Sequence, residues 1–216
     1  MILSLFLQNL RRSGQVIVFL SCLLSVVAYG EDLPPGLLSK CYTCHKETGR
    51  SWVEEVPTLS GQNQTYLKNQ LYAFKLDQRK DLLLYRMNGI AQELTDEEIE
   101  IITRYYSGID PKVYWQPSDQ FVNEEEERLY RLGEQHSPVC LACHTEAENR
   151  PPARPDFPYI SGQNQIVIEM QLEFFAAGKR RNPMMDFIKQ EPFNSQEMRK
   201  ALAIFFSRQA PPSPIP

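Results

Sequence analysis

Apolar residues recur along the chain at the spacing of α-helices. Residues 64–74 and residues 165–175 both carry them at turn-like intervals without an internal glycine or proline, and the two patterns break at Asp77 and Gly178. No alternating apolar and polar stretch of any length occurs, so β-strands are not expected. The pattern therefore predicts an all-α protein.

Capping and charge signals mark three further helices. Thr95 and Glu98 have the spacing of a capping box and open one of them. Its counterpart near the C-terminus is expected to begin at Asn194 or Ser195. The acidic run 124–127 opens the third, which leads to the cysteines of the second half. The first half has only "LPPGLLSK" in the corresponding place, so its leading helix is expected to be short or missing.

Several motifs occur twice. The segment "PTLSGQNQ" begins at Pro57 and "PYISGQNQ" begins at Pro158, an offset of 101 residues. The sequence Cys-x-x-Cys-His ends at His45 and again at His144, an offset of 99 residues. The chain is therefore a duplicated unit of about 100 residues, in which small drifts of the offset are typical of loop insertions.

A linker separates the two units. Residues 107–120 contain glycine, two prolines and polar residues, which are typical of a connection between domains and place the boundary near residue 118. We expect a first domain at 31–118 and a second at 119–216, in which residues 209–216 form a proline-rich tail.

The first 30 residues have the composition of a secretory signal. Arg11 and Arg12 precede an apolar run at 16–28, and small residues around Gly30 offer a cleavage site. The 13 residues of this run are fewer than the ~20 that a membrane-spanning helix needs. We expect cleavage near Gly30 and export of the mature chain, with a retained anchor as the alternative.

Charge and cysteine content limit the classes of function that the chain can have. The chain has a net charge of −4, and removal of Arg11 and Arg12 leaves 21 basic against 27 acidic residues, a net charge of −6. Without a basic stripe, nucleic-acid binding is not expected. Of five cysteines, Cys22 falls in the signal and the other four form the two motifs. In an oxidising compartment these four thiols must be committed to some chemistry.

The two motifs predict covalently bound haem. On the first turn of a helix, residues i and i+3 project from nearly the same side, and residue i+4 lies beside them. Two thiols so placed can add to the vinyl groups of one haem while the histidine binds its iron, which is the c-type attachment signature. We expect two haem c groups, with thioether bonds and iron ligands at Cys41, Cys44 and His45 and at Cys140, Cys143 and His144.

Other interpretations of these residues are weaker. Zinc ribbons place their two C-x-x-C halves about 15 to 20 residues apart, whereas a whole domain separates these. A thioredoxin-like redox pair needs no histidine after its second cysteine. The remaining histidine, His136, is expected at the surface and not on iron.

Methionines are the candidates for the sixth iron ligand. A thioether at that position leaves a haem that exchanges electrons but does not readily accept substrate. The first unit offers only Met87, in a loop-like stretch, and the second offers Met184 or Met185, of which we prefer Met185. Met170 and Met198 lie at helical spacing among apolar residues and are expected to fill the core.

The repeated Pro-x-x-x-Gly-Gln segment has an expected use beside the histidines. Metal-bound imidazoles normally donate their second N–H to a fixed acceptor, often a backbone carbonyl. The loops that begin at Pro57 and Pro158, 12 or so residues beyond each histidine, are candidates for that acceptor.

Taken together, these residues resemble the dihaem cytochromes of the cytochrome c4 family. The likeness rests on "CYTCH" and "CLACH", "PTLSGQ" and "PYISGQ", "MQLEFFAAGKRRNPMM" and "LTDEEIEIITRYYS", and it spans essentially the whole mature chain. It implies two tandem class I cytochrome c domains, each wrapped around one haem and related by a pseudo-two-fold axis. It places the iron ligands at His45 with Met87 and at His144 with Met184 or Met185. The chain departs from the family at "DQRKDLLLYRM" and at Lys46, where the family usually has glycine.

The resemblance also implies periplasmic electron delivery toward a terminal oxidase. We therefore expect an electron-transfer protein, not an enzyme, soluble or loosely membrane-associated, whose partners are a terminal oxidase and an upstream reductase or dehydrogenase. One alternative is the haem subunit of a flavoprotein dehydrogenase. Another is a dihaem peroxidase or thiosulfate-oxidising enzyme, which would need an open iron and acid–base groups that the sequence does not place there.

Overall fold

The computed structural model describes residues 36–80, 86–113, 120–144 and 153–211. They belong to one compact unit that begins at Gly36. We call residues 36–113 the first half and residues 120–211 the second half. The predicted signal segment, the boundary near residue 118 and the end of the C-terminal tail lie outside the described residues, and the domain limits stay a prediction.

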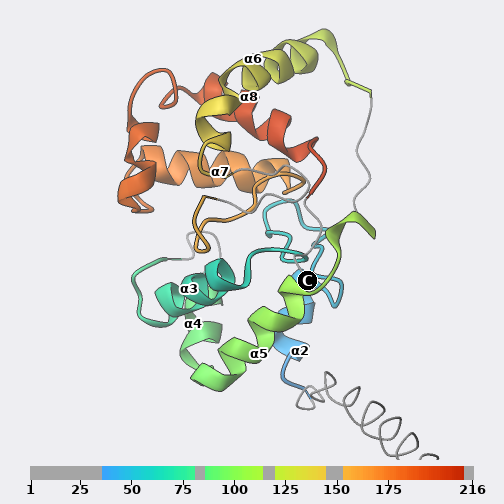
Figure 1. Cartoon of the computed structure of the whole chain (residues 1–216), viewed down its shortest axis with the longest axis vertical. Helices are drawn as coiled ribbons and strands as arrows, with labels where there is room; N and C mark the ends of the chain where they lie inside the picture. The colour runs from blue at the N-terminus through green and yellow to red at the C-terminus, as the bar shows by residue number, and fades with distance from the viewer. Residues whose placement is uncertain (1–35, 81–85, 114–119, 145–152, 212–216) are drawn as a thin grey trace, which may run out of the picture. The chain divides into compact units, whose positions relative to one another are not determined.

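The described residues form helices and loops and contain no β-strand, which confirms the all-α prediction (Figure 1). None of these helices is long and apolar enough to cross a membrane. In chain order the elements are α2 (Ser39–His45), α3 (Gln64–Lys75), α4 (Arg86–Gln92), α5 (Asp96–Ser107), the 3-10 helix η2 (Pro111–Val113), α6 (Glu124–Leu141), α7 (Gln165–Ala176), the 3-10 helix η3 (Pro183–Lys189) and α8 (Gln196–Ser207).

The duplicated apolar patterns form matching helices. Helices α3 and α7 both have 12 residues and end within one residue of the predicted limits. The chain then turns through positive φ at Asp77 (59°) and Gly178 (69°), the two predicted breaks. At Gly178 this conformation has no steric cost, because glycine lacks a Cβ.

Both capping predictions are confirmed. The Thr95 hydroxyl accepts from the Glu98 N–H at 3.2 Å while the Glu98 carboxylate accepts from the Thr95 N–H at 2.7 Å, which completes the capping box of α5. Of the two candidates for α8, Ser195 is the cap, because its hydroxyl accepts from the N–H of Met198. The leading helix of the first half is short, as expected: α2 has seven residues against 18 in α6.

The expectation that Met87 lies in a loop is wrong. Met87 is the second residue of α4, a helix that Gly89 disfavours by propensity. Its neighbour Asn88 is buried, and its side-chain amide donates to the carbonyl oxygens of Phe74 at 3.1 Å and Arg79 at 2.8 Å. These bonds to the end of α3 and the following turn hold α4 in place, so tertiary contacts outweigh local preference.

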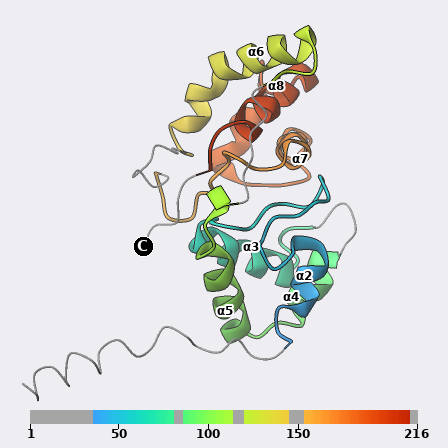
Figure 2. The same cartoon turned by 90° about the vertical axis from the view of Figure 1, so that its right-hand side faces the viewer.

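Each half has its own apolar core. In the first half α3 packs against α4 and α5, and in the second half α8 packs against α6 and α7. Figures 1 and 2 both show α6 and α8 side by side. At their crossing a Cβ on Gly133 would lie 2.2 Å from the carbonyl oxygen of Ala201, so only glycine permits this approach.

The last helix of each half anchors the repeated Ser-Gly-Gln loop. The N–H of Gly61 donates to the carbonyl of Tyr106 at 3.0 Å, and the N–H of Gly162 donates to that of Phe206 at 2.9 Å. Both glycines have positive φ, 65° and 69°, which side chains disfavour. The two loops that were expected to support the histidines are thereby fixed to α5 and α8.

Candidate functional site

The two Cys-x-x-Cys-His motifs lie on helical turns at different places in their helices. The first occupies α2, which ends at His45. The second lies at the C-terminal end of α6, not on a first turn, and the N–H of His144 still bonds to the carbonyl of Cys140 at 2.9 Å. None of the four motif cysteines is in a disulfide. Their sulfurs are therefore available for thioether bonds to haem.

Both histidines are buried, with their rings fixed by backbone carbonyls. His45 Nδ1 lies 3.0 Å from the carbonyl oxygen of Pro57, and His144 Nδ1 lies 2.8 Å from that of Pro158. A carbonyl only accepts, so Nδ1 carries the proton and Nε2 has the lone pair that can bind a metal. This confirms the acceptor role predicted for the two loops.

Electrostatics favour the neutral form of the second ring. Burial lowers the pKa of His144 below its ordinary value, against the smaller opposing effect of the bond to Pro158. The neutral imidazole is the form that coordinates metal. Burial therefore favours the form of the ring that can bind a metal, and the bond to Pro158 orients it.

A cavity of about 510 Å³ connects the two motifs. This volume falls within the ~300–1,000 Å³ typical of cofactor sites. Its walls are mainly apolar, and they bring together every predicted site residue, namely Cys41, Cys44, His45, Met87, Cys140, Cys143, His144, Met184 and Met185. Thiols, imidazoles and thioethers around an apolar cavity form the donor set of c-type haem, so the residues present fit this group.

The methionines of the second half differ in their burial and in whether they line the cavity. Met185 is half-buried and packs against the core, whereas Met184 is 54% exposed, although both line the cavity. Met198 is buried in the core as predicted. Met170 was expected in the core and instead lines the cavity wall. In the first half, Met87 is half-buried and faces the same cavity from α4.

His136 lies apart from these residues. Its ring is half-buried on α6, and its Nδ1 lies 2.9 Å from the carbonyl oxygen of Leu132, one turn earlier in the helix. His136 is not one of the described residues that line the cavity. The expected surface position is met only in part, and the expectation that His136 does not bind iron stays a prediction.

Sequence reasoning missed a cluster of polar side chains on the cavity wall. The Arg79 guanidinium donates to Gln70 at 2.6 Å and to Gln171 at 3.1 Å, and that of Arg180 donates to Gln171 at 2.6 Å and to Gln70 at 3.1 Å. Each arginine therefore binds glutamines of both halves. The signal that could have revealed the cluster is the recurrence of both residue types at the same offset of 101.

The cluster makes this wall of the cavity positive. Arg180 also donates to the Tyr66 hydroxyl at 3.2 Å. Burial opposes ionisation of Tyr66, but the charges of Arg180 and Arg79 outweigh it and lower the pKa of the hydroxyl. Haem propionates are carboxylates, which guanidinium groups bind well, so these arginines could hold them.

Comparison with known proteins supports the same interpretation. No family model matches the chain. A cytochrome c4 from Thiocapsa roseopersicina is 31% identical over 144 residues, which cover 66% of this chain and 72% of that protein. A protein from Thiomonas intermedia named as a thiosulfate dehydrogenase electron acceptor is 29% identical, covering 68% of this chain and 67% of that one.

A solved structure agrees at the level of the fold. The cytochrome c4 of Acidithiobacillus ferrooxidans superposes with a TM-score of 0.64 at 27% identity, covering 79% of this chain and 99% of that one. Cytochromes of this kind are electron-transfer proteins that carry two covalent haem c groups. The chain belongs to the cytochrome c4 family and is a dihaem electron-transfer cytochrome.

Proposed function

We propose that the protein is a periplasmic carrier that takes electrons from a respiratory reductase or dehydrogenase and delivers them to a terminal oxidase or a similar acceptor. The observation that carries this proposal is that enough potential ligands line one cavity to close both haem irons, a set that we call the closed donor set. Two buried histidines of fixed tautomer line one cavity together with Met87 and Met185. A thioether opposite each imidazole would leave no place for a substrate.

The residue roles follow from the motifs and their positions. Cys41 and Cys44 attach the first haem, and His45 with Met87 binds its iron. In the second half the corresponding set is Cys140, Cys143, His144 and Met185. When bound, the haem irons supply reversible one-electron oxidation and reduction. The chain itself orients the imidazoles, excludes water with apolar walls and places positive charge beside the cavity.

One comparison favours a dehydrogenase as the electron donor. The Thiomonas relative is named as an electron acceptor of thiosulfate dehydrogenase. A carrier that drains a dehydrogenase has the same internal requirements as one that feeds an oxidase. Purification from the native membrane and soluble fractions distinguishes a free carrier from a subunit, because a subunit copurifies with its dehydrogenase in a fixed ratio.

Export is part of the proposal. The segment that carries it, residues 1–30, lies outside the described residues. N-terminal sequencing of the mature protein tests it, with a start near Glu31 expected and a start at Met1 contradicting cleavage.

Methionine variants of the holoprotein test the closed donor set. Met87→Ala and Met185→Ala should each remove the methionine-to-ferric-iron charge-transfer absorption of one haem and lower one midpoint potential, because a neutral thioether stabilises ferrous iron. Met184→Ala is the matched control, since this side chain is mostly exposed. Spectra and redox titrations of the three variants supply the measurement.

The outcomes separate the assignments. If Met184→Ala has the effect and Met185→Ala does not, the second ligand is Met184. If no variant changes the spectrum, or if the unaltered protein binds cyanide readily, the irons are not closed by methionine and the carrier proposal fails.

A further inference from the structure

Each histidine is held by one planar peptide group. The carbonyl of Pro57, which accepts from His45, belongs to the same peptide unit as the N–H of Thr58. Because this unit is rigid, its oxygen cannot move without its N–H. Whatever binds the N–H of Thr58 therefore also orients the acceptor of His45.

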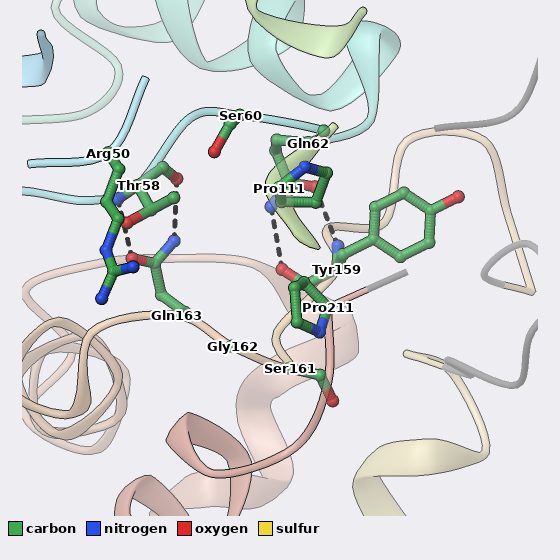
Figure 3. A pocket seen from close by; sticks show the side chains of 11 residues that line it. Arg50, Thr58, Ser60, Gln62, Pro111, Tyr159, Ser161, Gly162, Gln163 and Pro211 are labelled. Atoms are coloured by element: carbon green, nitrogen blue, oxygen red, sulfur yellow. Dashed lines mark hydrogen bonds between the residues drawn. The ribbon is translucent and has the colours of Figure 1, made fainter. Parts of the chain in front are cut away.

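The residue that binds this N–H comes from the opposite half. Gln163 accepts from the N–H of Thr58 with its Oε1 at 2.8 Å and donates to the Thr58 carbonyl with its Nε2 at 2.9 Å (Figure 3). The peptide group between Pro57 and Thr58 is thus hydrogen-bonded to Gln163 through its N–H and to His45 through its carbonyl oxygen.

The same arrangement occurs in the reverse direction. Gln62 of the first half accepts from the N–H of Tyr159 at 2.8 Å and donates to the Tyr159 carbonyl at 2.8 Å (Figure 3). The peptide unit that contains this N–H presents the Pro158 carbonyl to His144. Gln62 and Tyr159 are both less than 10% exposed, so water does not replace these bonds.

Both glutamine side chains also bind the backbone of the residue that follows them. Besides the bond across the halves, Gln62 Oε1 accepts from the N–H of Asn63 at 2.9 Å, and Gln163 Oε1 accepts from that of Asn164 at 3.0 Å. The two lone pairs of each amide oxygen are thereby used. The glutamines are therefore rigid clamps, not mobile surface amides.

We infer that Gln163 and Gln62 are positioning residues, each of which sets the hydrogen bond of the histidine in the opposite half. The inference rests on the proposed binding of iron by the two histidines. Hydrogen bonds in a chain polarise one another, so a peptide whose N–H is bonded has a better carbonyl acceptor. A better acceptor raises the basicity of the imidazole, favours ferric iron and lowers the midpoint potential. Each haem is thus tuned by the other half of the molecule.

The competing explanation is that the glutamines only hold the halves together. In that case any bond across the same interface would serve equally well. Asn164 provides the control, because its Nδ2 donates to the Val56 carbonyl at 2.8 Å, close to the clamp, without binding the peptide unit between Pro57 and Thr58.

The test uses the holoprotein and three variants. In Gln163→Met the potential of the haem on His45 should rise while that of the haem on His144 stays unchanged. The ring Nδ1–H of His45 in the reduced protein should exchange with solvent about fivefold faster, as expected for the loss of one hydrogen bond. Gln62→Met should give the mirror result at His144, and Asn164→Ala should change neither haem. NMR-monitored redox titration and ¹⁵N-labelled histidine supply both readouts.

Three results would overturn the inference: a shift confined to the haem of the variant's own half, equal shifts of both haems, or the same shift in Asn164→Ala. If one glutamine variant fails to fold, the other removes the equivalent hydrogen bonds in the opposite half and still tests the inference. Failure of the proposed ligation is visible separately, because a histidine that does not bind haem iron would lack a haem ring-current shift already in the unaltered protein.

Discussion

Lys46 follows the first Cys-x-x-Cys-His motif with a backbone that lysine rarely adopts. Its φ of 61° and ψ of 164° lie in a region used almost only by glycine, which costs other residues on the order of 1–3 kcal/mol. Two contacts surround it: its carbonyl accepts from the Tyr106 hydroxyl at 3.1 Å, and its ammonium lies 3.7 Å from the centroid of the Trp52 ring. The departure from the family's glycine therefore leaves strain beside His45.

Two substitutions at this position isolate the strain. Lys46→Gly and Lys46→Ala both remove the contact with Trp52, but only glycine relieves the backbone. We expect the glycine variant to be about 1 kcal/mol more stable than the alanine variant, because the strain released exceeds the entropy that glycine loses on folding. Urea unfolding of the two holoproteins measures the difference. Equal stabilities would show that the turn carries no strain.

At the scale of elements, an ion pair joins the start of α6 to the end of α8. The Glu126 carboxylate accepts from the N–H of Val122 at 2.6 Å and from the guanidinium of Arg208 at 2.7 Å. Its side chain is only 20% exposed and that of Arg208 15%. The bond from Val122, followed by that from Arg208, lowers the pKa of Glu126 below 4.5.

The lowered pKa predicts how stability changes with pH. A carboxyl group whose folded pKa is depressed contributes its full stabilisation above the unfolded value of 4.5 and loses it as the pH falls through the folded value. Glu126→Gln should therefore cost about 1 kcal/mol at neutral pH, and the difference from the unaltered protein should shrink in acid. Urea unfolding at a series of pH values measures this.

Glu125 is the matched control for this experiment. It pairs with Arg128 at 2.8 Å, but both side chains are more than half exposed, so Glu125→Gln should change the free energy of unfolding little. If the two variants lose the same stability, or if the Glu126→Gln effect persists unchanged in strong acid, the partly buried ion pair does not stabilise the junction of α6 and α8.

The elements that sequence predicts well are those with local signals. Helices α3 and α7 follow from apolar spacing, and α5 and α8 follow from their caps. Helix α4 was missed because its stability comes from the amide of Asn88, which binds chain atoms 9 to 14 residues away. The residues next to Asn88 in the sequence give no indication of these more distant contacts.

At the scale of the whole molecule, the duplication and the motif residues can be predicted from sequence, but the contacts between halves cannot. The motifs identify Cys41, Cys44 and His45 because their spacing is itself the chemical requirement. The bonds of Gln163 to Thr58 join residues 105 positions apart, and nothing near either residue indicates them. Only the recurrence of the same segment in both halves gives a hint.

The arginine cluster differs from the glutamine clamps in its reach. Arg79 and Arg180 bind glutamines of both halves and line the cavity that both haem sites share. A charge acts through space on both irons, whereas a clamp acts through one peptide on one histidine. Substitutions in the two groups should therefore have different signatures.

We expect Arg180→Gln to lower both midpoint potentials, because the guanidinium charge disfavours the extra positive charge of ferric iron. At an effective dielectric constant of about 20 the loss is about 1 kcal/mol, on the order of 40 mV for a one-electron couple. Arg79→Gln should act in the same way from the other half. Arg181→Gln removes an exposed charge beside the cluster and serves as control, with little change expected because solvent screens it. A shift of one haem alone in either cluster variant would mean that the two arginines act within their own halves, and that the halves are coupled only where the glutamines clamp the loops.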